Sequence, residues 1–244
     1  MRNFIAVLVC ILPSFIGVLV LRLLGHKIGK KVRIGFSFIC AKQITLEDNV
    51  KIGHFNLIIN NALVLNKGVC IGYLNMLKGP FNLLLKEKAA IGNKNYLTRS
   101  SRGITYGESN LFLGELTKIT TGHHIDLTQS ISFGKFSILA GINSQLWTHG
   151  YYHADTGKDR IRIDGKIQIG DNVYIGSGCI FNPGVKVGNA IHVGSGSVVS
   201  KDLEKPGMYV SQGLRHIENS LDKVKSKLKK VKDHGLVEPI YKKE

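Results

Sequence analysis

Aliphatic side chains recur at every sixth residue through the second half of the chain. One column begins at Ile163 and runs to Val199 without a slip, and a second column lies two residues earlier. The first column is Ile163, Ile169, Ile175, Phe181, Val187, Val193 and Val199, and the second is Ile161, Ile167, Val173, Cys179, Val185, Ile191 and Ser197. Each unit thus holds an apolar-x-apolar pair, which is typical of a short strand. Because so short a unit cannot bury its own face, the pattern predicts stacked coils of a parallel β-helix.

Glycines follow these columns at regular positions. Four come directly after the first column and three lie two residues further on: Gly170, Gly176, Gly188 and Gly194, then Gly178, Gly184 and Gly196. We expect the chain to bend sharply at these glycines.

The same period begins close to the N-terminus. The first members are Ile28, Ile34, Cys40, Leu46, Ile52 and Ile58, with Val32, Phe38, Ile44 and Val50 in the second column. Shifts of one or two residues then give Leu65, Ile71 and Leu77, followed by Leu85, Ile91 and Leu97. Such shifts are typical of enlarged turns. We therefore predict one all-β solenoid over residues 26–205, with room for about ten coils at a spacing of about 4.8 Å.

The segment before the solenoid is apolar. Residues 4–21 carry no charge, and Pro13 interrupts them. We predict an apolar N-terminal helix within residues 1–25 that contacts a membrane, either spanning it or lying in its surface with a kink at Pro13. A cap on the end of the β-helix is the alternative. The basic residues that follow favour a cytoplasmic location for the rest of the chain, at the inner face of the membrane.

The segment after the solenoid, residues 206–244, has a helical pattern. Apolar residues alternate at spacings of three and four from about Arg215 to His234: Ile217, Leu221, Val224, Leu228 and Val231. This spacing predicts a C-terminal helix that caps the solenoid or faces a neighbouring subunit, followed by a tail. A role in binding a partner or a membrane surface is the alternative.

The charge of the chain predicts an anionic partner. Lys and Arg number 33 against 17 Asp and Glu, which gives a net charge of +16. No helix-turn-helix, zinc or RNP pattern is present, so a membrane surface or the phosphates of coenzyme A are favoured and no nucleic acid is expected.

The repeats also resemble a known family. The run IGDNVYIGSG, then NPGVKVG and VGSGSVVSKDL, is similar to the hexapeptide-repeat acyltransferases. This resemblance implies a left-handed β-helix, a homotrimer with active sites between subunits, and acetyl-CoA as co-substrate, with no metal. Many members of that family acetylate sugar hydroxyls, so the resemblance also implies a sugar or glycan acceptor, possibly lipid-linked, of a capsule, O-antigen or exopolysaccharide.

The repeat is interrupted between Leu139 and Ile163, and we expect an active-site loop over residues 143–162. Its string WTHGYYH resembles the catalytic segment of the polysaccharide O-acetyltransferase branch, where one histidine is the general base. On that resemblance His149 is the catalytic residue. The neighbouring residues expected to bind substrate are Trp147, Thr148, Tyr151 and Tyr152.

A neutral imidazole suits removal of a proton from a sugar hydroxyl near neutral pH. Because the thioester is already activated, we expect direct transfer in a ternary complex, without a covalent enzyme intermediate. A structural histidine among aromatic residues is the alternative for His149.

Further residues are candidates by the same resemblance. His124, Asp126 and His153 are candidates for catalytic support, with Asp126 orienting an imidazole, although a surface turn explains Asp126 equally well. The resemblance also places donor binding along the later coils, at Gly176, Ser177, Asn182, Gly194, Gly196 and Lys201. Their glycines are explained by turns alone.

Other functions fit parts of the pattern. A zinc hydratase of the γ-carbonic anhydrase type shares the expected fold, with His124, His149 and His153 as conceivable ligands. A non-catalytic, membrane-associated β-helix scaffold is a second alternative. The repeats do not distinguish acetyl-CoA from a donor of longer acyl chains.

Overall fold

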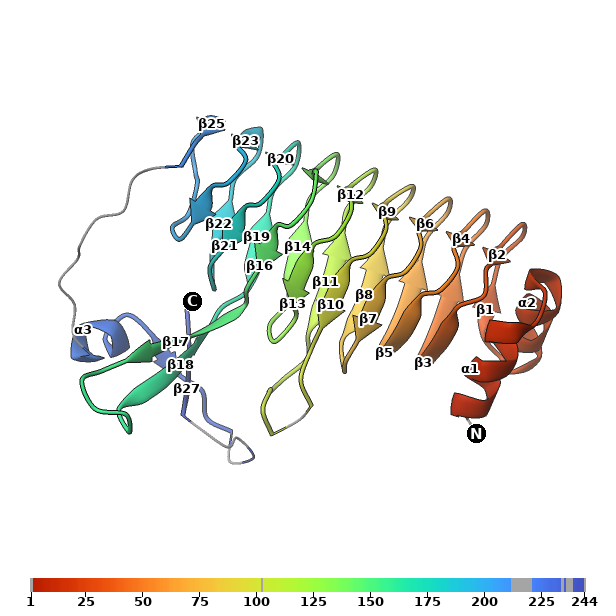
Figure 1. The fold of residues 1–244 in the computed structure, drawn as a ribbon, viewed down its shortest axis with the longest axis horizontal. Helices are drawn as coiled ribbons and strands as arrows, with labels where there is room; N and C mark the ends of the chain where they lie inside the picture. The colour runs from red at the N-terminus through yellow and green to blue at the C-terminus, as the bar shows by residue number, and fades with distance from the viewer. Residues whose placement is uncertain (1, 102, 212–220, 234, 236–238, 244) are drawn as a thin grey trace.

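The chain winds into a parallel β-helix whose coils stack along one long axis (Figure 1). The computed structural model describes residues 2–101, 103–211, 221–233, 235 and 239–243. A nine-stranded sheet forms face 1 of the helix, and a fourteen-stranded sheet divides at β5 to form faces 2 and 3. The predicted parallel β-helix is therefore confirmed.

The coils run in the order face 1, face 2, face 3. Face 1 contains β2 (Arg33–Ile34), β4 (Lys51–Ile52), β6 (Cys70–Ile71), β9 (Ala90–Ile91), β12 (Lys118–Ile119), β15 (Ile138–Leu139), β20 (Tyr174–Ile175), β23 (Ile191–Val193) and β25 (Gly207–Tyr209). Two long strands, β3 (Phe38–Leu46) and β5 (Leu57–Leu65), cross from face 2 to face 3.

Faces 2 and 3 continue from these long strands. Face 2 goes on with β7 (Met76–Lys78), β10 (Tyr96–Thr98), β13 (His124–Asp126), β16 (Gln145–Leu146), β21 (Ile180–Phe181) and β24 (Val198–Val199). Face 3 contains β1 (Lys27–Ile28), β8 (Asn82–Leu85), β11 (Asn110–Leu113), β14 (Ile131–Phe133), β19 (Ile167–Ile169) and β22 (Lys186–Val187).

The sixth-residue columns form the core, as predicted. From Ile167 to Val199 every member of both columns is at most 5% exposed. The first two members are the exception, because Ile161 and Ile163 lie in a hairpin outside the coils. In β3 the prediction is wrong by one residue: Ile39 and Ala41 are buried, whereas Phe38 and Cys40 are partly exposed.

The glycines serve two purposes, and only one of them is a bend. Gly178 has a φ of +67°, a left-handed conformation that an L side chain rarely adopts. Gly176 instead lies against the next coil, where a Cβ atom would be 2.7 Å from the backbone nitrogen of Ser195. Close stacking of coils therefore explains the glycines that directly follow the first column.

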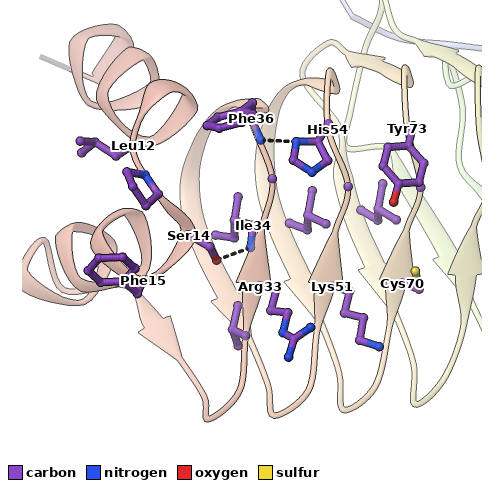
Figure 2. A pocket seen from close by; sticks show the side chains of 17 residues that line it. Leu12, Ser14, Phe15, Arg33, Ile34, Phe36, Lys51, His54, Cys70 and Tyr73 are labelled. Atoms are coloured by element: carbon purple, nitrogen blue, oxygen red, sulfur yellow. Dashed lines mark hydrogen bonds between the residues drawn. The ribbon is translucent and has the colours of Figure 1, made fainter.

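Two helices cover the first coil. The predicted single helix is broken at Pro13 into α1 (Arg2–Ile11) and α2 (Ser14–Leu23). Val9, Val18 and Leu21 pack in the core, and the Ser14 hydroxyl accepts a hydrogen bond of 2.9 Å from the edge amide of Ile34 (Figure 2). No helix among the described residues is both long and apolar enough to cross a membrane.

The later part of the chain leaves the coils and returns to them. After β16 it forms an antiparallel hairpin of β17 (His149–His153) and β18 (Arg160–Asp164), so the predicted loop is an ordered ribbon. The C-terminal strand β27 (Ile240–Lys242) pairs with β18 (Figure 1), and β26 (Lys229–Lys230) pairs with β27.

The predicted C-terminal helix ends earlier than expected. Within the described residues of this segment α3 (Leu221–Lys225) is the one helix, and residues 212–220, where the predicted helix begins, are outside the described residues. Beyond α3 the lysine-rich segment has a narrow apolar stripe, and strand pairing with the hairpin determines its conformation instead.

Candidate active site

His149 lies at the point where the hairpin leaves face 2, and its ring contacts a carboxylate from the preceding coil. Asp126 ends β13, and the register of β13 with β16 brings residue 126 beside residue 147. The Nδ1 atom of His149 is 2.9 Å from Oδ2 of Asp126. Asp126 thus accepts a hydrogen bond from the Nδ1–H group, which leaves Nε2 as the basic nitrogen of the neutral ring.

Asp126 is held in place by four further hydrogen bonds. Its Oδ2 accepts from the backbone amide of Thr148 at 3.0 Å and from the Thr148 hydroxyl at 2.6 Å. Its Oδ1 accepts from the backbone amide of Thr128 at 3.2 Å and from the Thr128 hydroxyl at 2.8 Å. The carboxylate is only 8% exposed, so this network fixes the plane in which it meets the imidazole.

The electrostatics of this pair favour the charged forms of both partners. Burial alone would raise the pKa of Asp126, but hydrogen bonds from His149, Thr148 and Thr128 outweigh it and hold the pKa below its usual value. The hydrogen bond to Asp126 raises the pKa of His149, and burial opposes this only in part. The pair is therefore built to accept a proton at Nε2 and to stabilise the resulting imidazolium.

Two aromatic rings flank His149. The rings of Trp147 and Tyr151 each lie with their centroids 6.3 Å from that of His149, in edge-on orientations. Both side chains are partly exposed, at 38% and 46%, so both are available to a ligand. Tyr152 is half-buried, and strand alternation places it on the other side of the hairpin from His149.

Thr148 differs from its predicted role. Its side chain is completely buried, and its hydroxyl donates to Asp126 and accepts from the amide of Gln129. Thr148 therefore supports the carboxylate and is not placed to contact a substrate.

The other predicted histidines lie apart from this pair. His124 is exposed on face 2, where its ring contacts Tyr96 at 5.6 Å, and His153 is exposed at the far end of β17 beside Tyr151. Among the described residues, no three His, Cys, Asp or Glu side chains gather as metal ligands would. The three histidines of the zinc alternative are therefore not brought together.

The predicted donor-binding residues divide between two corners of the coil. Asn182 follows β21 and Lys201 follows β24, at the corner between faces 2 and 3 from which the His149 hairpin leaves. A Cβ atom at Gly150 would lie 3.7 Å from Pro183, so the hairpin base and this corner adjoin. Four residues lie at the opposite edge of face 2: Gly176, Ser177, Gly194 and Gly196.

A groove of about 750 Å³ opens in front of the pair. Asp126, Trp147 and His149 line one end, and the lining extends over preceding coils to Asn3 on α1. His149 therefore lies at one end of a long cleft.

Several supporting residues were not anticipated from the sequence. Thr128 was detectable, because an aspartate that accepts the amide two residues on is a common turn motif. Arg162 and Asp164 form a buried ion pair of 2.9 Å behind the site, and Gln129 donates to Asp164 at 3.4 Å. Their spacing of two in β18 places them on one side of the strand, but only the fold shows that this side is buried.

Comparison with known proteins agrees with the repeat pattern. Residues 166–201 match the bacterial transferase hexapeptide family (six repeats), and no curated protein matches the chain. Similar solved structures include the polySia-specific acetyltransferase NeuO, 20% identical over 77% of this chain and 82% of that protein, with a TM-score of 0.44. Others are the polysialic acid O-acetyltransferase OatWY (15% identical, 80% and 93% covered, TM-score 0.39) and the Bacillus cereus N-acyltransferase AntD in complex with dTDP and 3-hydroxybutyryl-CoA (17% identical, 88% and 94% covered, TM-score 0.30). The matched residues lie within the coiled part of the chain, which runs from Lys27 to Tyr209.

Proposed function

We propose that the protein is an acyltransferase that moves an acetyl group from acetyl-CoA to a hydroxyl of a sugar or glycan. The observation that carries this proposal is the His149–Asp126 pair at 2.9 Å, which opens on a groove in a hexapeptide-repeat β-helix. A buried carboxylate that holds one ring nitrogen leaves the other as a directed general base.

The reaction follows from this geometry. Nε2 of His149 takes the proton of the acceptor hydroxyl while the oxygen attacks the thioester carbonyl carbon. The tetrahedral intermediate then collapses, the C–S bond breaks, and the departing thiolate receives the proton from the imidazolium. Asp126 stabilises the positive ring between these two transfers, so the residues described here need form no covalent bond to the acyl group.

The lysines near the hairpin base support a polyanionic donor. A cavity of about 340 Å³ lies beside the corner at Gly184 and is lined by Gln129, Gly165, Lys166, Gln168, Gly184, Lys186, Lys242 and Lys243. Four lysine side chains around one cavity suit the phosphates of a nucleotide. Together with Asn182 and Lys201, these lysines are our candidates for holding the nucleotide end of acyl-CoA.

Replacement of His149 tests the proposal. His149→Ala should lower the rate of thiol release from acetyl-CoA in the presence of an acceptor by about 10²–10⁴-fold, with donor binding nearly unchanged. His124→Ala is the matched control, because that histidine is exposed on the same face and contacts Tyr96 instead. A His149→Ala variant with a normal rate would rule out this base, and the absence of donor binding by the wild type would favour the scaffold alternative.

We also propose that the protein works as a homotrimer at the inner surface of a membrane, where a lipid-linked acceptor would be within reach. Apolar side chains remain exposed along both N-terminal helices, namely Phe4, Val7, Ile11, Phe15, Leu19 and Leu23. Lys27, Lys30 and Lys31 follow on the first coil, and their charge suits anionic lipid. Flotation with anionic and neutral vesicles should show binding only to the anionic ones, and weaker binding for Phe15→Ser with Leu19→Ser.

A further inference from the structure

The groove in front of His149 follows one corner of the β-helix. Successive coils contribute lining residues at the turn from face 2 to face 3. Coil by coil, these are Cys40 and Lys42; Asn60 and Asn61; Lys78, Gly79 and Pro80; Thr98 to Ser101; Asp126; and Trp147 with His149. These coils are linked by the pairings of β3, β5, β7, β10, β13 and β16. Five steps at one strand spacing correspond to a length of about 24 Å, which exceeds one sugar ring.

Asn60 is a buried polar side chain without a partner in this groove. It is only 6% exposed, and neither its Oδ1 nor its Nδ2 atom has a hydrogen bond. Buried asparagines elsewhere in the coils differ, because Asn56, Asn75 and Asn95 bond to one another and to backbone carbonyls. Leaving a buried amide unpaired costs folding free energy, so Asn60 indicates a site whose partner is a ligand.

The corner is also hollow at this level. Ala41 pairs with Asn60 from the preceding coil, and Gly79 follows Lys78 in the next one. A Cβ atom at Gly79 would lie 2.8 Å from the backbone nitrogen of Arg99, so a larger residue is excluded there. Asn60 lines the groove between these two small residues.

The charge along the groove is positive. Lys42 and Lys78 are exposed, and neither has a carboxylate partner among the residues that the structure describes. Arg99 is buried beside them, donating to the backbone carbonyls of Pro80, Tyr106 and Gly107, while its Nε atom has no partner. Asp126, the one carboxylate in the lining among the described residues, is occupied by His149, Thr148 and Thr128.

We propose that this groove binds an acidic oligosaccharide segment several sugars long, with the reacting hydroxyl beside His149. Lys42 and Lys78 pair with carboxylates of the glycan, Asn60 bonds a sugar hydroxyl or carboxylate, and Trp147 with Tyr96 offers aromatic surface to the rings. This assignment rests on the proposed acyltransferase function, since it makes the groove the acceptor site.

Binding without turnover separates the two proposals. In a His149→Ala background and without acyl-CoA, calorimetry should be run with tetrasaccharides of galacturonic, glucuronic and sialic acid, each beside its carboxyl-reduced neutral form. At least one acidic tetrasaccharide should bind about tenfold more tightly than its carboxyl-reduced form. It should also bind about tenfold more tightly than the acidic monosaccharide from which it is built. If no acidic form is preferred, the groove assignment is overturned, whatever the activity of the wild type.

Two pairs of variants localise the binding. Lys78→Gln should remove most of the preference for the acidic form, while Lys118→Gln on face 1 should leave it unchanged. Asn60→Ala should weaken binding of the acidic tetrasaccharide about tenfold. The variant should melt at or above the wild-type temperature, because it removes an unpaired buried amide and because alanine already occupies the paired position at residue 41.

Asn75→Ala is the control for Asn60, since it removes bonded amide atoms of the asparagine ladder. It should melt lower and keep normal affinity. Unchanged affinity in Asn60→Ala would overturn the proposal. A change of oligomeric state in Asn60→Ala or Lys78→Gln, with affinity retained, would overturn it in favour of a contact between copies of this chain.

Discussion

Two histidines of neighbouring coils show how local surroundings decide the chemistry of an imidazole. His123 is fully buried, and its Nδ1 accepts the amide of Ser144 at 3.2 Å. Burial lowers the pKa of His123 to about 4, so the ring is neutral and fills the core. His149 has a carboxylate at the same nitrogen, and its pKa is raised. The difference is one carboxylate, which the register of β13 with β16 supplies.

Removing the charge of Asp126 should therefore change both the rate and its pH dependence. A general base must be neutral, so the rate of the wild type should fall as the pH drops through a pKa that lies above the usual 6.5 of histidine. Asp126→Asn removes the interactions that raise this pKa, so the acidic limb of the profile should move to lower pH. The plateau rate should also fall, by about 10²–10⁴-fold, because the imidazolium loses its counter-charge and the ring its fixed tautomer.

The matched control for Asp126→Asn is Thr128→Val. It removes one hydroxyl bond to Oδ1 of Asp126 and keeps the carboxylate, so the limb should move much less. The measurement is the pH profile of kcat/KM from pH 5 to 9 for all three proteins. An acidic limb at the same pH in wild type and Asp126→Asn would show that another group titrates.

At the scale of elements, the sixth-residue pattern predicts the coils well and the excursions poorly. Leu65, Leu97 and Phe133 are all completely buried, because each coil repeats the same local geometry. Ile161 and Ile163 continue the same spacing by coincidence, since alternation also fits a hairpin strand. The second partner of β18, besides β17, is β27 from the C-terminal segment, and no local pattern reveals so distant a pairing.

The candidate site was predictable to a similar extent. The string around His149 indicated a candidate base, and the structure places Asp126, the candidate for orienting an imidazole, in register one coil away. Asn60 and the buried pair Arg162–Asp164 depend on which side of each strand faces inward. That choice is made by corners and insertions, which the spacing of aliphatic residues does not describe.

The C-terminal strand should stabilise the active-site hairpin. Ile240 in β27 is 1% exposed, and its strand pairs with Arg162 to Asp164 in β18. A chain that ends at residue 239 should show faster amide hydrogen exchange in β17 and β18, while the coils keep their protection. Lys242→Ala is the control for hydrogen exchange, since it removes a lysine of the proposed donor cavity and keeps the strand backbone. Unchanged exchange in the hairpin of the shortened chain would contradict this role for the tail.

On the scale of the whole molecule, the β-helix is nearly one-dimensional, so its ends need protection that the middle does not. At the first coil this protection comes from α2, whose Ser14 accepts the amide of Ile34 and whose Arg22 donates to the carbonyl oxygens of Ile28 and Gly29. A hollow of about 660 Å³ lies between the turn at Pro13 and face 1 (Figure 2). The inner sides of α1 and α2 thus cover the edge, and their outer sides carry the exposed apolar residues.

Deleting residues 1–24 should therefore cause association through the uncovered coil. The deletion removes Val9, Val18 and Leu21 from the core and leaves the edge amide of Ile34 without its acceptor, so the exposed strands of one chain can pair with those of another. Light scattering after size exclusion should show species larger than those of the full chain. Phe15→Ser with Leu19→Ser changes two exposed side chains and keeps Ser14 and the buried residues of α2, so it should keep the wild-type mass in solution while losing binding to anionic vesicles. If the deletion variant had the subunit number of the full chain and melted at the same temperature, the helices would not protect this end, and contact with the membrane would remain as their role.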